Sequence, residues 1–127
     1  MGLFTKRKSV DQLEQERHAD ELHQLAQLAF QGITPIAETK WRDRVKVAGH
    51  VKAMRVQPWA EQVDGLELTL TDSTGGITLV FFGRRRIGGI QLGSKMMVEG
   101  TTSEHHGLLT ILNPQYQLLP NEIDLPF

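Results

Sequence analysis

The sequence predicts a mainly β protein, in which a five-stranded Greek-key barrel follows one N-terminal helix. Two observations predict this fold. Between residues 44 and 119, β-forming residues alternate with polar ones in five segments separated by turn-forming residues. Ahead of them, residues 9–31 place apolar side chains at three- and four-residue spacing. One helix is too few for an α/β fold, and a closed or nearly closed barrel accommodates five short strands without unpaired edges.

The composition is that of one small domain with an appendage. The chain has 127 residues, a net charge of −1 and no cysteine, which excludes disulfides, cysteine metal sites and cysteine nucleophiles. Lys and Arg exceed Asp and Glu between residues 40 and 119, whereas both ends are acidic. A mildly basic centre is compatible with nucleic acid as a partner. Because the N-terminus has no apolar signal segment and no apolar run is long enough to span a membrane, we expect a cytoplasmic protein without a membrane partner.

The first element is an amphipathic helix over residues 9–31. Ser9 is its expected N-cap, with Gln12 as the capping-box partner, and Gly32 and Pro35 end it. Its second half carries the apolar stripe Leu22, Leu25, Ala26, Leu28 and Ala29, whereas its first half is mostly charged. The stripe needs a burial partner, which is either the barrel of the same chain or the helix of a second copy.

The segments around the helix and the barrel are expected to be irregular. We expect residues 1–8 to be disordered, residues 32–43 to form a linker, and residues 120–127 to form a loose tail.

The barrel spans residues 44–119, and its five expected strands are 44–57, 66–72, 77–82, 95–100 and 108–119. In the first strand, apolar residues face one side and Arg44, Lys46, His50 and Lys52 face the other. Gly49 in mid-strand indicates a bulge or a sharp bend, and Pro58 is expected to end this strand.

The connections between the strands carry turn signals. Asp72 to Gly76 suits an antiparallel hairpin, with the Asp72 side chain bonding to the backbone of its own turn. A barrel of this kind commonly has a short helix between its third and fourth strands, but Gly88 and Gly89 favour a single turn or a loop. Residues 101–107 are expected to form a loop, and Asn113–Pro114 to interrupt the last strand.

The barrel region resembles the OB-fold family of the anticodon-binding and RecG-wedge kind. The matching stretches are "VKVAGHVKAMRVQP", "LELTLTDSTGGITLVFFGRRRIGGIQLGSKMMVEG" and "GLLTILNPQYQL". They are most similar to small actinobacterial OB-fold nucleic-acid-binding domain proteins, which share a helical N-terminal extension, the pattern GRR-x-I-x-GI and the pattern NP-x-Y. The resemblance covers residues 44–119 and, more loosely, the helix. It implies the OB fold in a bacterial nucleic-acid-binding protein, without the motor domains of the RecG helicase.

Binding of a single strand needs positive charge for the phosphates. The candidates are the adjacent Arg84, Arg85 and Arg86 after the third strand, together with Arg44, Lys46 and Lys52 on the outer face of the first. Three adjacent arginines cannot all point the same way, so at most two should reach a ligand. The alternative, for each of these residues, is that its side chain is exposed to solvent and contacts no ligand.

Flat aromatic side chains are the second requirement, because bases stack on them. Alternation places Phe81 in the core and Phe82 outside, so Phe82 is a stacking candidate unless the N-terminal helix covers it. Trp59, expected in the loop between the first two strands, is the second stacking candidate. Trp41 is expected to pack the helix against the barrel, and the orientation of Tyr116 depends on the break at Pro114.

The sequence offers no catalytic machinery. It contains no phosphate loop, no nucleophile elbow and no set of metal ligands, so we expect a non-enzymatic protein without catalytic residues, metal or cofactor. His105 and His106 are adjacent and are expected to contact a ligand or solvent.

These observations favour an OB-fold module that binds single-stranded DNA or RNA with little sequence preference. The alternative is a protein–protein interaction or oligomerisation module, in which the barrel and residues 9–31 bind a protein partner or a second copy.

Overall fold

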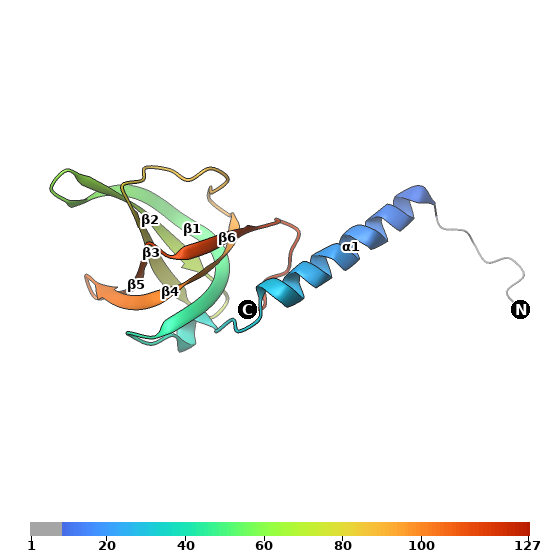
Figure 1. Ribbon diagram of the computed structural model, residues 1–127, viewed down its shortest axis with the longest axis horizontal. Helices are drawn as coiled ribbons and strands as arrows, with labels where there is room; N and C mark the ends of the chain where they lie inside the picture. The colour runs from blue at the N-terminus through green and yellow to red at the C-terminus, as the bar shows by residue number, and fades with distance from the viewer. Residues whose placement is uncertain (1–8) are drawn as a thin grey trace, which may run out of the picture.

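The computed structural model describes residues 9–127, so the expectation for residues 1–8 lies outside the described part of the chain (Figure 1). One long helix extends from a small β-barrel (Figure 1). The elements in chain order are the helix α1 Val10–Ala29, the short 3-10 helix η1 Ile36–Glu38, and the strands β1 Arg44–Ala60, β2 Val63–Thr71, β3 Gly76–Phe82, β4 Lys95–His105, β5 Leu108–Leu112 and β6 Gln115–Leu119.

The strands form the expected Greek-key barrel. Its order is β1-β2-β3-β5-β4-β6, and the barrel closes because β1 also pairs with β4. The β3–β5 pairing is parallel and the other pairings are antiparallel. The predicted fifth strand is two strands, since the chain breaks at Asn113–Pro114 as expected. Both halves pair with β4: β5 pairs with its residues 102–105, and β6 pairs with its residues 95–99.

β1 is long because it serves two neighbours. It pairs with β4 from Arg44 to His50 and with β2 from His50 to Ala60. A Cβ at Gly49 would lie 2.3 Å from the carbonyl oxygen of Thr71, so the glycine allows the close approach of two backbones at this corner. The pairing of β1 with β2 is irregular at two places: at Lys52, between the paired residues Val51 and Ala53, and at Trp59, between Pro58 and Ala60.

Two expected strand ends were wrong. Pro58 does not end β1: it pairs with Asp64 of β2, and the other edge of β1 has no strand partner there among residues 9–127, so the missing N–H removes no ladder bond. Trp59 therefore lies within β1 and not in a loop. Likewise β4 does not stop at Gly100, because pairing with β5 carries it on to His105.

The core confirms the period-two pattern of β2, whereas β3 is buried on both faces from Ile77 to Phe81. Leu66, Leu68 and Leu70 of β2 are at most 1% exposed. The connection between β3 and β4 contains no helix, as Gly88 and Gly89 predicted, and its Ile87 and Ile90 are part of the core cluster. Two isoleucines of an irregular loop thus fill core space that a helix commonly covers.

The turn between β2 and β3 is tied to the linker before the barrel. One carboxylate oxygen of Asp72 accepts hydrogen bonds from the Oγ1 of Thr74 and from the backbone N–H groups of Thr74 and Gly75, at 2.6, 2.7 and 3.0 Å. The other accepts from the backbone N–H of Ile36 in η1 at 2.9 Å. Partial burial alone would raise the pKa of Asp72, but these hydrogen bonds outweigh it and hold the pKa below its usual value. The linker is thereby anchored, and Ile36 lies in the core.

Within residues 9–127, the C-terminal end of α1 packs against the rest of the chain. The capping box of Ser9 and Gln12 is present as predicted. Leu25, Ala26 and Ala29 pack against Leu119 and Ile123, so the helix docks on its own chain. Residues 120–127 are therefore not a loose tail, since Ile123 is 1% exposed and its carbonyl oxygen accepts a 2.6 Å hydrogen bond from the Nζ of Lys95.

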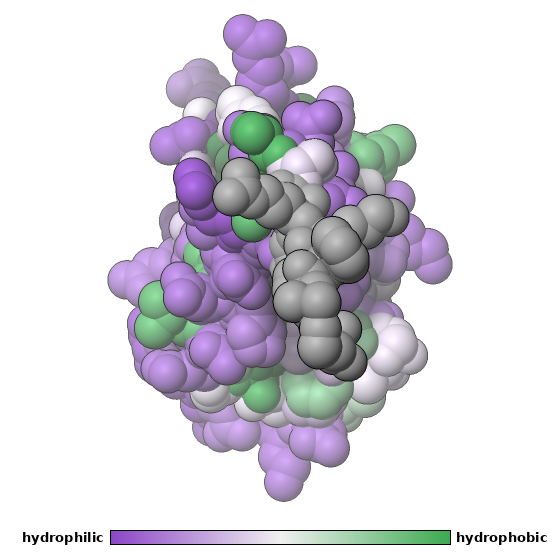
Figure 2. All heavy atoms as spheres, turned by 90° about the vertical axis from the view of Figure 1, so that its right-hand side faces the viewer, coloured by the Kyte–Doolittle hydropathy of each residue, from purple (hydrophilic) through white to green (hydrophobic). Residues whose placement is uncertain are grey.

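The rest of α1 extends away from the barrel. Residues 10–21 are all exposed, and Leu28, expected in the buried stripe, is 69% exposed. Figure 2 views the molecule from this side and shows mostly hydrophilic side chains with small, separate hydrophobic patches. Neither α1 nor any other helix within residues 9–127 combines the length and the apolar character needed to cross a membrane.

Candidate nucleic-acid interface

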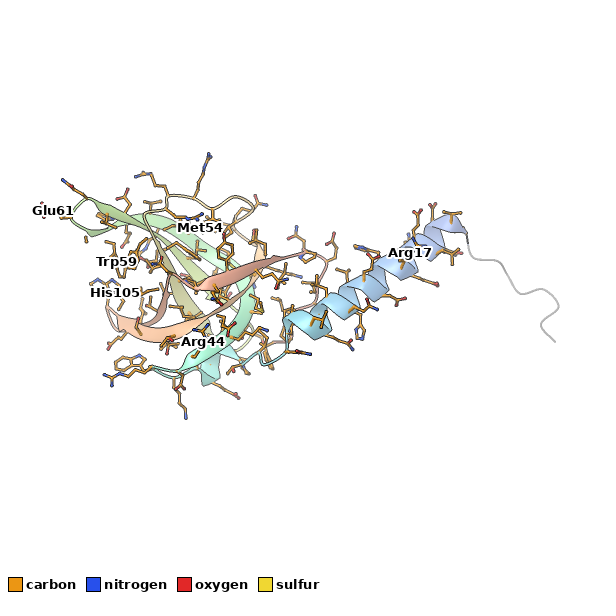
Figure 3. The ribbon with its side chains drawn as sticks, viewed as in Figure 1. Arg17, Arg44, Met54, Trp59, Glu61 and His105 are labelled. Atoms are coloured by element: carbon orange, nitrogen blue, oxygen red, sulfur yellow. The ribbon has the colours of Figure 1, made fainter. Side chains whose placement is uncertain are left out.

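Four rings form a row on the outside of the barrel, named here the ring row: Phe82, Trp59, His105 and His106. The centroids of Phe82 and Trp59 are 5.1 Å apart at 64°, those of Trp59 and His105 are 3.9 Å apart at 34°, and those of the two histidines are 4.0 Å apart at 67°. The row joins the ends of β3, β1 and β4. Figure 3 shows Trp59 and His105 together, between the ends of the β1–β2 and β4–β5 hairpins.

The local sequence explains this arrangement. Phe81 is buried in the core and Phe82 is half-buried on the outer face, as alternation predicted. Phe82 pairs with Gly65 of β2, and a Cβ on that glycine would lie 3.6 Å from the Cβ of Trp59. Trp59 therefore lies beside the Gly65–Phe82 pair, where its ring reaches that of Phe82.

A tight turn brings the histidines to the row. His106 and Gly107, with φ angles of 51° and 78°, connect β4 to β5. Positive φ at both central residues is characteristic of the two-residue type I′ hairpin turn, whose twist suits antiparallel strands. His105 is therefore the last residue of β4 and pairs with Leu108, not part of the expected loop.

Of the three adjacent arginines, one is already paired. Arg84, Arg85 and Arg86 are all exposed in the loop that follows Phe82 and Gly83. The guanidinium of Arg85 lies 2.6 Å from a carboxylate oxygen of Asp64 in β2. Arg84 and Arg86 make no hydrogen bond or ion pair with any of residues 9–127. Two free guanidinium groups thus lie within four residues of Phe82 along the chain.

The remaining predicted charges lie elsewhere on the barrel. The Nε of Arg44 is 3.5 Å from a carboxylate oxygen of Glu99, and the Nζ of Lys46 donates to the carbonyl oxygen of Gln31 at 2.9 Å. Both lie where β1 pairs with β4, and Arg44 is far from Trp59 in Figure 3. The structure therefore does not bring Arg44 and Lys46 to the ring row.

Lys52 occupies a third place. It is exposed and lines an open hollow of about 580 Å³ beside the β2–β3 turn, together with hydroxyl side chains of that turn. Between this hollow and the ring row, Arg55 forms a 2.9 Å ion pair with Glu67 across β1 and β2. The charges of Arg55 and Glu67 cancel on the face between the hollow and the ring row. The free positive charges nearest to Phe82 along the chain are in residues 83–86, named here the arginine loop.

Trp41 and Tyr116 are outside the ring row. Trp41 is 53% exposed and does not pack the helix against the barrel, because the end of α1 docks on Ile123 instead. Tyr116 is 40% exposed, and its ring meets the core ring of Phe81 edge-on at 5.5 Å. Nor does α1 cover Phe82, which packs against Trp59.

Sequence reasoning did not assign His105 to the aromatic site. The available signal was the pair His106–Gly107 between two alternating stretches, which is compatible with a two-residue hairpin turn. Within residues 9–127, no group of three or more His, Asp or Glu side chains is arranged to hold a metal ion.

Comparison with known proteins identifies the fold. No family model and no curated protein matches the sequence. Among solved structures, the OB domain of Ta0387 from Thermoplasma acidophilum is similar, with a TM-score of 0.58, 13% identity, and coverage of 75% of this chain and 92% of that one. The second OB-fold domain of replication protein A from Methanococcus maripaludis is also similar, with a TM-score of 0.55, 18% identity, and coverage of 72% and 97%. Together with the strand order, these similarities show that residues 44–119 form an OB-fold barrel. The helix α1 precedes this barrel in the chain.

Proposed function

We propose that this protein is a non-enzymatic OB-fold module that binds single-stranded nucleic acid across the ring row and the arginine loop, residues 83–86. The observation that carries the proposal is the position of Trp59. It lies on the outer face of the second and third strands, between the hairpin ends, in contact with Phe82 and His105. In OB-folds this face and the loops beside it bind oligonucleotides and oligosaccharides.

The chemistry of the surface suits nucleic acid in two ways. A base stacked on an aromatic side chain contributes about 1–3 kcal/mol, and any base can stack. The two unpaired guanidinium groups of Arg84 and Arg86 can each contact a phosphate. The similarity to an OB-fold domain of replication protein A supports nucleic acid as the class of ligand.

The arrangement also indicates how strong and how selective binding should be. Rings read the flat face of a base and not its edge, so we expect little sequence preference and no strict choice between DNA and RNA. Each phosphate neutralised on a single strand contributes about −0.7 to the logarithmic salt slope, so Arg84 and Arg86 together should contribute about −1.4. Affinity should therefore be moderate and should fall with salt.

Fluorescence anisotropy of labelled oligothymidylate and oligouridylate tests the proposal. At about 20 mM salt, where screening is weak, we expect saturable binding that weakens as salt is added. Replacing Arg84 and Arg86 together by Ala should lower both the affinity and the salt slope. The control replaces Arg17 and Arg44 by Ala, which removes the same charge from α1 and from the far part of β1 (Figure 3). Absence of binding at low salt, or equal losses in both double variants, would contradict the proposal.

One observation favours the alternative, a protein-interaction module. Val10 and Leu13, on the first half of α1, are 70% and 50% exposed. Sedimentation of the full-length protein measures self-association directly. If α1 mediates it, the wild-type protein forms dimers or larger species, and replacing Val10 and Leu13 by Ser returns it to the monomer. A monomeric wild type would leave self-association through α1 without support.

A further inference from the structure

The ring of His105 lies on Trp59 in the position that a stacked base would need. We infer that His105 closes the stacking site of the ligand-free protein, and that a bound base displaces it. This inference rests on the proposed function and adds a residue that controls access to it.

The rings of His105 and Trp59 lie close together on the surface of the barrel. The ring centroids of His105 and Trp59 are 3.9 Å apart and the planes are tilted by 34°, which is closer to a stacked arrangement than to an edge-on one. A base that stacks on an aromatic side chain needs the same close, face-on space. One face of an indole cannot hold both rings, so base and imidazole exclude each other there.

The second contact of Trp59 is held more firmly. Phe82 meets the indole at 64°, and its backbone N–H donates a 2.9 Å hydrogen bond to the Oδ1 of Asn113. Its strand β3 is paired on both sides, with β2 and with β5. Movement of the Phe82 backbone would break its pairing with Gly65 and this hydrogen bond, so the backbone that carries the ring is a fixed part of the site.

His105 is the ring that can leave. Pairing between β1 and β4 ends at Thr101, so from Ser103 onward β4 pairs with β5 and has no strand on its other edge among residues 9–127. His105 is also the last paired residue before the turn of His106 and Gly107. Its departure requires a side-chain rotation or a small bend of the hairpin end, without loss of the barrel.

His106 supports the closed position. Its φ of 51° is in the left-handed region, where His is enriched, with Asn and Asp, among non-glycine residues, so the turn itself suits a histidine. Its ring lies 4.0 Å from that of His105 and completes the ring row. The imidazole of His105 is thus in contact with one ring on each of two sides, Trp59 and His106.

The expected consequence is that removal of the imidazole improves binding. Aromatic pairs contribute about 0.5–1.5 kcal/mol, so His105→Ala should tighten the binding of single strands by about two- to tenfold. His105→Phe keeps a ring that can stack on Trp59, so its affinity should not exceed that of the wild type. His18→Ala, which removes an exposed histidine of α1, should change nothing.

The experiment compares these three full-length variants with the wild type by anisotropy, using labelled oligothymidylate of about ten nucleotides. A second readout needs no ligand: in a Trp41→Phe background, acrylamide should quench the fluorescence of Trp59 more strongly when His105 is Ala than when it is His. Tighter binding together with stronger quenching supports the inference.

The contrary results separate the two proposals. If the wild type binds but His105→Ala binds equally or more weakly, or if quenching does not rise, the inference is wrong and the proposed function stands. If the wild type binds no single strand at low salt, the proposed function fails, and the inference fails with it.

Discussion

The guanidinium of Arg85 lies 2.6 Å from the carboxylate of Asp64, and this contact distinguishes Arg85 from its two neighbours. The side chains of the pair are 73% and 41% exposed, so the bond is of the kind that contributes little to stability. The pair affects binding instead, because Asp64 neutralises the charge of Arg85, so that Arg85 is not available to contact a phosphate.

Replacement of Asp64 by Asn should therefore release Arg85. We expect tighter binding of single strands and a salt slope steeper by about 0.7, the contribution of one further phosphate contact. Anisotropy over a series of salt concentrations measures both quantities. Glu61→Gln is the matched control, because it removes one negative charge from the neighbouring β1–β2 turn without touching Arg85. If both variants gain equally, general repulsion and not the Arg85–Asp64 pair is responsible.

The Asp72 carboxylate should make stability depend on pH in the acid range. Its pKa is lowered in the folded protein, so its contribution is present above the unfolded-state pKa of about 4 and is lost as pH falls through the lower folded value. Urea unfolding at pH 7 and near pH 3 should show that Asp72→Asn costs about 1 kcal/mol at pH 7 and much less in acid. An equal cost at both pH values would show that the charge of Asp72 is not what matters.

The close approach at Gly49 predicts intolerance of any side chain. The atom that a Cβ would meet at 2.3 Å is the backbone oxygen of Thr71, which cannot move without distorting β2. Gly49→Ala should destabilise the protein by about 3 kcal/mol or more in urea unfolding. At Gly88 a Cβ meets nothing within 4 Å and φ is not positive, so Gly88→Ala should be neutral or slightly stabilising. Similar effects of the two substitutions would contradict the close approach.

Ile123 should hold α1 to the barrel. Its side chain packs with Ala29 and Leu119, so Ile123→Ala should cost about 2 kcal/mol and loosen the end of the helix. Urea unfolding measures the cost, and limited proteolysis between α1 and η1 reports the loosening. Leu28→Ala, at the same end of α1 but 69% exposed, should have little effect on either. Equal sensitivity of the two variants would mean that α1 is not docked through Ile123.

Much of the fold could be predicted from local sequence. Period-two alternation identified the inward leucines of β2, Ser9 and Gln12 marked the start of α1, and Gly88 and Gly89 indicated a loop without a helix. The ends of β1 and β4 could not be predicted, because pairing with distant strands sets them. Pro58 is tolerated because one edge of β1 has no strand partner there within residues 9–127, which is a property of the assembled sheet.

The candidate site could be predicted in part. Alternation correctly placed Phe82 outside, yet a sequence cannot show which cations are already paired. Arg44 and Lys46 are engaged with Glu99 and with the carbonyl oxygen of Gln31, neither of which is near them in sequence. The same limit applies to His105, whose partner Trp59 is on another strand.

The most direct test of the central claim compares Trp59→Ala with Trp41→Ala. Anisotropy with single-stranded oligonucleotides at low salt should give wild-type affinity for Trp41→Ala, since this exposed residue is outside the ring row. Trp59→Ala should weaken binding by about five- to 150-fold, which corresponds to about 1–3 kcal/mol for a stacked base. Unchanged affinity of Trp59→Ala, or the same loss in both variants, would show that the ring row is not the nucleic-acid site.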